Sequence, residues 1–193
     1  MWAAITPRLA GGATRGARSR AFLRCKKGAT AVEFALVAAP FLALLLAILQ
    51  SGIVFFSARV LDEVTEEASR YIMTGQAQLG SVTQSGFKTY LCTGSNTSAL
   101  VSALFTCSKI MINVQSYASF ASASTATPTL TFDGSGNVSN SWGYSTGNPG
   151  DIVVVQVMYQ WPVVLGPLSM NLGNLSNGNR LLISSAVFKN EPY

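Results

Sequence analysis

A single carboxylate stands at the start of the longest uncharged run in the chain. Glu33 precedes residues 34–58, which contain no charged side chain. A carboxylate at the start of a membrane span costs several kcal/mol if it is buried unpaired, so it usually has a partner. If the chain were cut after Gly28, Ala29 would carry a new α-ammonium group. A neighbouring subunit's α-ammonium could then pair with Glu33, neutralise both charges and set the register between subunits.

A simpler interpretation of Glu33 uses no partner. The carboxylate would lie in the lipid headgroup region near the start of a helix, where a negative charge is stabilised by the helix dipole. The residues alone leave both interpretations open.

Other reactive side chains are sparse. The chain has no histidine, which removes the commonest general base and the commonest metal ligand. Of its three cysteines, Cys25 lies near the N-terminus, whereas Cys92 and Cys107 lie far beyond the apolar run and could form a disulfide in an oxidising compartment. Asp133 and Asp151 could form an acid pair, but both stand beside turn-forming residues, where Asp is common. We therefore expect no enzyme activity, no metal and no cofactor.

The charge is distributed unevenly. Only 11% of the residues are charged, against roughly 25% in an average soluble domain. No acidic residue precedes Glu33, so residues 29–193 carry the other six basic residues and all eight acidic ones. A basic head before an apolar run is typical of membrane topology rather than nucleic-acid binding, although residues 1–28 also have the composition of a mitochondrial transit peptide. Seven of the thirteen basic residues lie in this head: Arg8, Arg15, Arg18, Arg20, Arg24, Lys26 and Lys27.

The apolar run predicts one membrane-spanning helix. At about 1.5 Å per residue its length is roughly 37 Å, more than the ~30 Å hydrocarbon core and too long for a cleavable secretory signal. The basic head stays in the cytoplasm, so Arg59 onward is exported. We expect a cytoplasmic leader over residues 1–28, a transmembrane helix over 29–58, and the lipid bilayer as a partner. A buried core helix is the alternative, but the remaining residues could hardly cover so long an apolar rod.

The start of the run resembles a known pattern. Basic residues, a glycine and an apolar run with Glu at its fifth position resemble type IV prepilins. The form Gly28-Ala-Thr-Ala-Val-Glu33-Phe34 is similar to the TadE-like pseudopilins of the tight-adherence (Flp, type IVb) pilus system. Further similar segments are Phe55-Phe56, Leu61-Asp62, Glu67-Ala-Ser-Arg70, Thr74-Gly-Gln-Ala77, Tyr159-Gln-Trp-Pro162 and the last seven residues.

This resemblance implies a function. It implies cleavage of the Gly28–Ala29 bond by a prepilin peptidase, a role for Glu33 and the adjacent Phe34 in recognition or assembly, and contact with other pilin-like subunits through the N-terminal helix. The protein would be a minor pilin of the bacterial inner membrane with a periplasmic C-terminal domain, needed to assemble an adhesive pilus. It would bind neither nucleic acid nor a small-molecule substrate. The alternative is an uncleaved, membrane-tethered binding module, which needs neither Gly28 nor Glu33.

Residues 59–76 predict an amphipathic helical stem that continues the span and stops at Gly75. Its apolar side chains recur at three- and four-residue steps and should lie on a globular domain. They are Val60, Leu61, Val64, Ala68, Tyr71 and Ile72, and on the opposite side lie Arg59, Asp62, Glu63, Glu66, Glu67 and Arg70. We interpret the charged side as a solvated face, with partner contact as the alternative.

Residues 77–193 should form an exported α+β domain. Residues 80–107 suggest two short helices, broken near residues 94–96. Strands are expected at 110–115, 152–159 and 181–188. With the resemblance, this predicts a pilin-like α+β fold, a long N-terminal helix packed on a small antiparallel sheet. The Ser/Thr/Gly-rich residues 116–150 read as a long surface loop and the first candidate for partner contact. We expect its aromatic residues to pack on the sheet rather than contact a partner: Phe120, Phe132, Trp142 and Tyr144.

Overall fold

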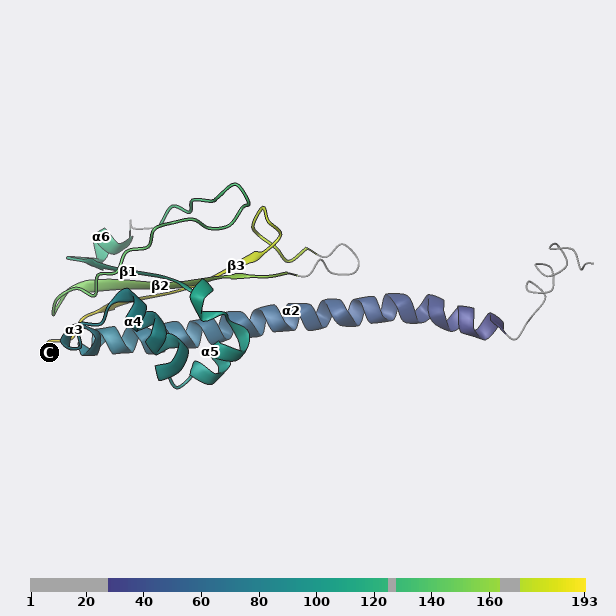
Figure 1. Cartoon of the computed structure of the whole chain (residues 1–193), viewed down its shortest axis with the longest axis horizontal. Helices are drawn as coiled ribbons and strands as arrows, with labels where there is room; N and C mark the ends of the chain where they lie inside the picture. The colour runs from purple at the N-terminus through teal and green to yellow at the C-terminus, as the bar shows by residue number, and fades with distance from the viewer. Residues whose placement is uncertain (1–27, 125–127, 164–170) are drawn as a thin grey trace, which may run out of the picture. The chain divides into compact units, whose positions relative to one another are not determined.

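The computed structural model describes residues 28–124, 128–163 and 171–193. The leader predicted for residues 1–28 therefore lies, apart from Gly28, outside the described residues. The chain divides into two compact units between Ala43 and Leu44, and each is described by itself. The elements in chain order are α2 (Ala29–Met73), α3 (Gln76–Leu79), α4 (Gln84–Thr89), α5 (Ser98–Leu104), β1 (Met111–Tyr117), α6 (Phe120–Ser124), β2 (Ile152–Trp161) and β3 (Arg180–Lys189) (Figure 1).

In the first unit, the described residues belong almost entirely to α2. Residues 29–43 are rich in Ala and Leu, which favour helix, and Pro40 is accommodated inside the helix. Their large side chains are exposed: Phe34 by 75%, Leu36 by 70% and Phe41 by 60%. Among the described residues of this unit, no core explains why these positions are apolar.

In the second unit, the remainder of α2 lies on one face of the sheet. The predicted apolar stripe is confirmed, because Val60, Leu61, Val64, Ala68 and Ile72 are at most 2% exposed. The stripe already includes Val54, which is upstream of the predicted stem. The buried hydroxyls along it, on Ser57, Thr65 and Ser69, each donate to the carbonyl four residues earlier at 2.6–2.8 Å, so no polar group is left unpaired there.

Helix α2 ends where the sequence predicts. Gly75 adopts the left-handed conformation with φ of +79°, and its N–H donates to the Ile72 carbonyl at 2.9 Å. The C-terminal residues close over this end, because the Glu191 N–H donates to the Met73 carbonyl at 3.0 Å. The Tyr193 ring occupies the space that a Cβ on Gly75 would need. Both the conformation and this contact require glycine here.

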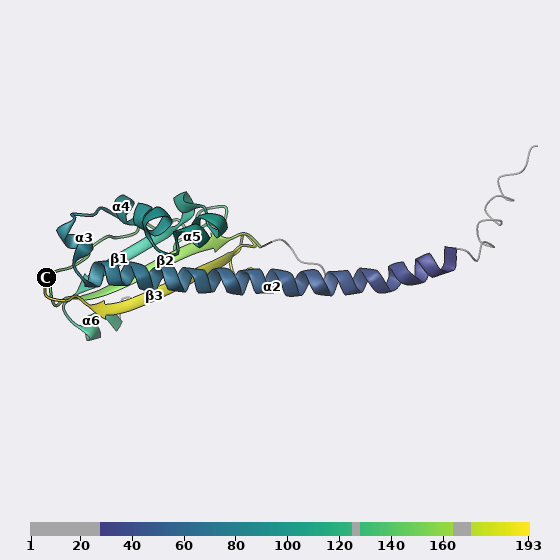
Figure 2. The same ribbon diagram turned by 90° about the horizontal axis from the view of Figure 1, so that it is seen from below.

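The three predicted strands form one antiparallel sheet in the order β1-β2-β3. Val155 of β2 pairs with Val114 on one side and Ala186 on the other. Helix α2 covers one face of this sheet, with α3–α5 beside it on the β1 side (Figure 2). Alternate residues of β2, from Val153 to Tyr159, form the core beneath α2. The predicted α+β fold is confirmed.

The two short helices predicted between residues 80 and 107 are α4 and α5, separated by a π-helical turn, Tyr90–Gly94. Helix α4 contributes Phe87 to the core, the π-helical turn contributes Leu91 and α5 contributes Val101, each at most 1% exposed. The structure joins Cys92 and Cys107 by a disulfide, with their Cα atoms 6.2 Å apart.

The predicted loop over residues 116–150 is more ordered than expected. It contains α6 and two isolated bridges, one of which pairs Tyr144 with Val114 of β1. Tyr144 and Trp142 are half-buried, and the Tyr144 ring lies 5.7 Å from that of Phe87. The expectation of packing is wrong for Phe120 and Phe132, which are 59% and 49% exposed, because their segments run along the surface.

Candidate functional site

The predicted scissile bond lies at the start of α2. The helix begins at Ala29, and Gly28 directly precedes it as an exposed residue. Apart from its chain neighbours, no described residue has an atom within 4 Å of the position that a Cβ on Gly28 would occupy. Nothing among the described residues therefore shields this residue from another protein.

Glu33 and Phe34 follow on the same helix, and both are exposed. The first turn of α2 contains no acidic residue, so Glu33 lies beyond the turn in which the helix dipole is most effective. Within the described ranges the one ion pair joins Arg59 and Asp62 at 3.7 Å, and Glu33 has no ionic partner. This geometry weakens the interpretation that relies on the dipole alone.

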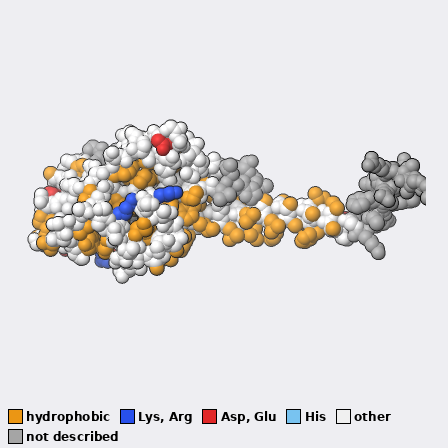
Figure 3. All heavy atoms as spheres, in the orientation of Figure 1, with side chains coloured by type: hydrophobic (Ala, Val, Ile, Leu, Met, Phe, Trp, Pro, Cys, Tyr) orange, Lys and Arg blue, Asp and Glu red, His pale blue; other side chains and the backbone are white. Residues whose placement is uncertain are grey.

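The N-terminal part of α2 presents a continuous apolar surface. It is the one helix among the described residues that is long and apolar enough to cross a membrane by length and composition. Such a helix could also be the core of a soluble protein, but here the side chains are exposed rather than buried. Figure 3 shows hydrophobic side chains gathered along it. Large side chains more than half exposed between residues 36 and 56 are Leu36, Val37, Phe41, Leu42, Leu44, Leu46, Ile48, Leu49, Ile53, Phe55 and Phe56.

One member of the predicted solvated stripe has an internal role that the sequence did not reveal. The Glu67 carboxylate accepts a hydrogen bond from the Asn96 N–H at 2.8 Å and one from the Thr97 hydroxyl at 3.3 Å. It therefore ties α2 to the loop that precedes α5. Helical periodicity could not identify these contacts, because they come from residues about thirty positions away.

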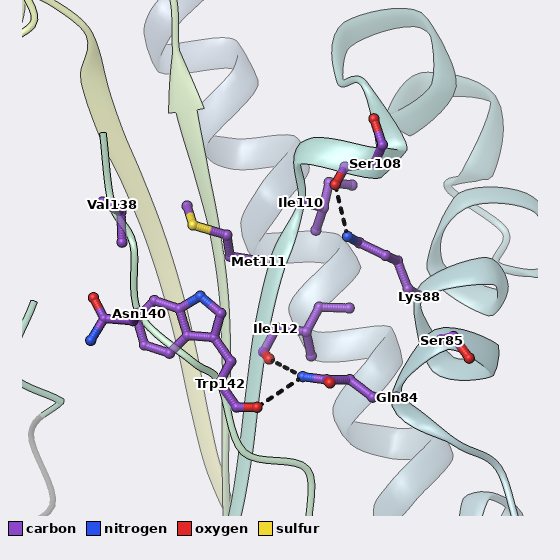
Figure 4. Close-up of a pocket in the computed structure, with 10 residues that line it drawn as sticks. All are labelled: Gln84, Ser85, Lys88, Ser108, Ile110, Met111, Ile112, Val138, Asn140 and Trp142. Carbon is purple, nitrogen blue, oxygen red and sulfur yellow. Dashed lines mark hydrogen bonds between the residues drawn. The ribbon is translucent and has the colours of Figure 1, made fainter. Parts of the chain in front are cut away.

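A pocket of about 400 Å³ lies between α4, the start of β1 and residues 138–142 (Figure 4). Its polar side chains mainly hold the fold together. The Gln84 amide donates to the carbonyls of Ile112 at 2.9 Å and Trp142 at 3.4 Å. The Lys88 ammonium donates to the Ser108 carbonyl at 3.0 Å, and burial lowers the pKa of Lys88. These bonds fasten α4 to its neighbours.

The sequence was expected to contain no Ser-x-x-Lys motif of the kind found in some acyl-transfer enzymes, and this expectation is wrong, because Ser85 and Lys88, which line this pocket, have that spacing. In such a site the serine hydroxyl lies within hydrogen-bond reach of its base. Here the Ser85 hydroxyl pairs with that of Thr83 at 3.0 Å, and it points away from the Lys88 ammonium (Figure 4). The spacing therefore does not form a catalytic pair in this structure.

The two aspartates considered as an acid pair are each engaged in a separate turn. Asp133 accepts hydrogen bonds from the N–H groups of Ser135 and Asn137, and bonds from Asn137 above all lower the pKa of Asp133. Asp151 accepts from the Asn148 N–H at 2.8 Å. The part of the chain that the structure describes contains no group of three or more His, Cys, Asp or Glu side chains that could hold a metal.

A long apolar helix left exposed at one end and packed on a small α+β domain at the other indicates a membrane-anchored protein with a pilin-like layout. Residues 28–70 match the family model described as TadE-like protein. This match confirms the predicted resemblance over those residues and indicates a pseudopilin associated with a Tad pilus. It begins at Gly28 and ends within the last turn of α2, so the sheet lies outside it. No curated protein and no solved structure matches the chain.

Proposed function

We propose that the protein is a non-enzymatic minor pilin of a Flp/Tad-type pilus. It inserts in the bacterial inner membrane with its N-terminus in the cytoplasm, is cut after Gly28 by a prepilin peptidase, and takes part in pilus assembly. The observation that carries this proposal is the coincidence of the family match, which starts at Gly28, with a helix whose apolar side chains are exposed.

The exposed part of α2 serves two apolar environments in turn. Before assembly, lipid surrounds its side chains, and during assembly the helices of other pilin-like subunits replace the lipid. Such a helix is expected to be apolar all round, since the described residues of its own domain leave it exposed. This accounts for the exposure of residues such as Leu36 and Phe41, which would be costly in water.

Glu33 supplies the polar part of this contact. Cleavage would create an α-ammonium group on Ala29 at the end of the helix. The Glu33 carboxylate of one subunit would form an ion pair with the α-ammonium group of a neighbouring subunit. Glu33 is available for this pair because it has no ionic partner among the described residues. A charge pair in an apolar environment is stable only when both members are present, so it selects a single axial register.

The exported domain would lie in the periplasm. The disulfide between Cys92 and Cys107 is consistent with this location, because disulfides persist in oxidising compartments. The basic residues of the leader stay on the cytoplasmic side.

The mature N-terminus tests the processing step. Mass spectrometry of the protein extracted from membranes should find a chain that begins at Ala29. The Gly28→Asp variant should accumulate as uncut precursor, whereas the control Gly16→Asp, in the same leader, should be cut normally. An intact N-terminus in cells with a working peptidase would overturn the processing proposal and favour an uncleaved tether.

A further inference from the structure

The two edges of the sheet differ in how their backbone groups are used. At the β1 edge, the Val114 N–H donates to the Gly143 carbonyl and the Val114 carbonyl accepts from the Ser145 N–H, both at 2.9 Å. The Ile112 carbonyl, two residues earlier, accepts from the Gln84 amide. Residues from other parts of the chain therefore cover this edge.

The β3 edge is fastened at its two ends. The Asn174 amide bonds both backbone groups of Leu181, accepting from its N–H at 2.7 Å and donating to its carbonyl at 3.5 Å. Since Asn174 is not part of β2, the backbone of Leu181 points away from β2. At the other end, the outward Glu191 N–H donates to the Met73 carbonyl.

Backbone groups between these two ends are open. In an antiparallel pair, successive residues point their N–H and C=O groups alternately toward and away from the neighbouring strand. The outward-pointing backbone N–H and C=O groups therefore include, besides those of Leu181, those of Ile183, Ser185, Val187 and Lys189. Within the described residues, none of these four has a backbone hydrogen bond on that side. They present a ready row of donors and acceptors for another strand.

The side chains do not protect this edge. Proteins commonly block an exposed edge with a central charge, a proline or a bulge. Here the pairing with β2 runs without a bulge from Arg180 to Lys189, and the charged residues stand only at those two ends. On the face away from α2, Ile183 and Val187 are 51% and 52% exposed.

Two separate hollows lie along this edge on the side of α2. One hollow of about 210 Å³ lies between Val54, Ala58 and Leu61 of the helix and residues 180–183 of β3. A second, of about 480 Å³, lies between residues 66–73 of the helix and residues 186–188. Alternate side chains of an added strand would enter these hollows.

We propose that the outer edge of β3 accepts an extended segment of a second, non-identical polypeptide. That segment adds a fourth strand to the sheet through the backbone groups of Ile183, Ser185 and Val187. Strand addition of this kind obtains affinity from main-chain hydrogen bonds and specificity from alternate side chains.

A second copy of this chain does not fit the edge. Strand β3 runs in the same direction as α2, because its start lies beside Val54 and its end beside Met73. Two β3 strands paired across a two-fold axis are antiparallel, so their α2 helices would be antiparallel too. This conclusion rests on the proposed function, in which all copies insert in one membrane with the same orientation. Addition of β3 to the β1 edge of a second copy is blocked by residues 143–145.

The side chains that line the two hollows also indicate which partner residues would fit. Val54, Ala58 and Leu61 require an apolar side chain in the hollow near the start of β3. The other hollow is lined by both Glu66 and Arg70, and neither has an ionic partner among the described residues, so a polar side chain of the partner fits there. The partner segment is thus an extended stretch with an apolar residue for the first hollow and, further along, a polar residue for the second.

Hydrogen exchange on the full chain tests this proposal. The amides of Ile183, Ser185 and Val187 should exchange rapidly in the purified protein in detergent. In membranes from cells that assemble the pilus they should exchange at least about tenfold more slowly, because pairing protects an amide from solvent. Equal rates in the two samples would overturn the proposal. Protection in the purified protein at high concentration would also overturn it, because the occupant would then be a second copy.

Two variants at one position separate backbone from side chain. Ser185→Pro removes an outward N–H that the fold does not use, whereas Ser185→Ala keeps it. We expect Ser185→Pro alone to lose both the protection at Val187 and pilus assembly, with the mature N-terminus at Ala29 unchanged. Normal assembly and protection in Ser185→Pro would contradict strand addition. Because processing is read from the same samples, failure at the edge is distinguishable from failure of the proposed function.

Discussion

The two halves of helix α2 both contain many apolar side chains, but these side chains are exposed to different degrees. Between residues 57 and 73, the apolar side chains lie mainly on one stripe, and Leu61, Val64 and Ile72 on it are at most 2% exposed. Between residues 30 and 53, apolar side chains lie on every side of the helix, and almost all of them are exposed.

One continuous helix therefore combines two patterns of apolar side chains, each suited to a different environment. The C-terminal half has the amphipathic pattern of a helix packed on its own domain. The N-terminal half has the composition of a membrane span, for which lipid or neighbouring helices replace the missing core. The family match over residues 28–70 spans the boundary between the two halves.

Truncating one side chain in each half should give the largest contrast. Ile72→Ala removes a fully buried side chain and should lower the free energy of unfolding of the domain by about 2–5 kcal/mol. Leu46→Ala, at a position 53% exposed, should change it by less than about 0.5 kcal/mol. Denaturation of the full chain in detergent measures both. Equal losses would mean that the N-terminal half is also packed on the domain.

Removing the disulfide should affect only the half of the molecule that carries the domain. Cys92 and Cys107 are 15 residues apart, and closing a loop of this size stabilises a fold by about 3 kcal/mol in the chain-entropy model. The double variant Cys92→Ser/Cys107→Ser should therefore unfold at lower denaturant concentration. Cys25→Ser, in the leader, is the control and should leave unfolding of the domain unchanged.

Glu67 should be distinguishable from its neighbours on the charged side of α2. Glu67→Ala leaves the Asn96 N–H and the Thr97 hydroxyl without their carboxylate and should cost about 1–2 kcal/mol of domain stability. Glu63→Ala, at an exposed position one turn earlier, should cost less than about 0.5 kcal/mol. Equal free energies of unfolding for the two variants would mean that Glu67, like Glu63, contributes only to the solvated charged side of α2.

The smallest expected effect is a pH dependence of the domain at Tyr144. Burial raises the pKa of Tyr144 from 10.0 to about 12, so the folded state holds this proton more tightly than the unfolded chain does. The stability that the protonated Tyr144 contributes is therefore fully present below pH 10 and is lost as the pH rises from 10 toward about 12. Tyr144→Phe should flatten this decline, as measured by denaturation at several pH values. It should not destabilise the domain at pH 7, because the buried hydroxyl has no hydrogen-bond partner among the described residues.

Much of the fold could be predicted because its signals are local. The alternation in residues 110–115, the β-branched run in 152–159 and the three- and four-residue steps of the stem each report a burial pattern within a single element. Gly75 marked the end of α2 for a similar local reason. The proposed processing residues likewise come from one compact segment around Gly28 and Glu33.

What the sequence did not reveal depends on contacts between distant residues. Nothing in the charged stripe distinguishes Glu67 from Glu63, because their difference arises from Asn96 and Thr97. The exposure of Phe120 could not be inferred from its apolar type, since burial depends on where its segment runs. The open edge of β3 is visible only once the order of the strands is known.

Replacing the charge of Glu33 tests the central claim that the exposed half of α2 is an assembly surface. We predict that the Glu33→Gln variant is still cut after Gly28 but yields at least about tenfold fewer pili, because the neighbour's α-ammonium is left unpaired in an apolar environment. The matched control Glu63→Gln, on the solvated side of the other half, should assemble normally. Pilus yield in sheared fractions, with the mature N-terminus read by mass spectrometry, measures both. Normal assembly by Glu33→Gln would contradict the account.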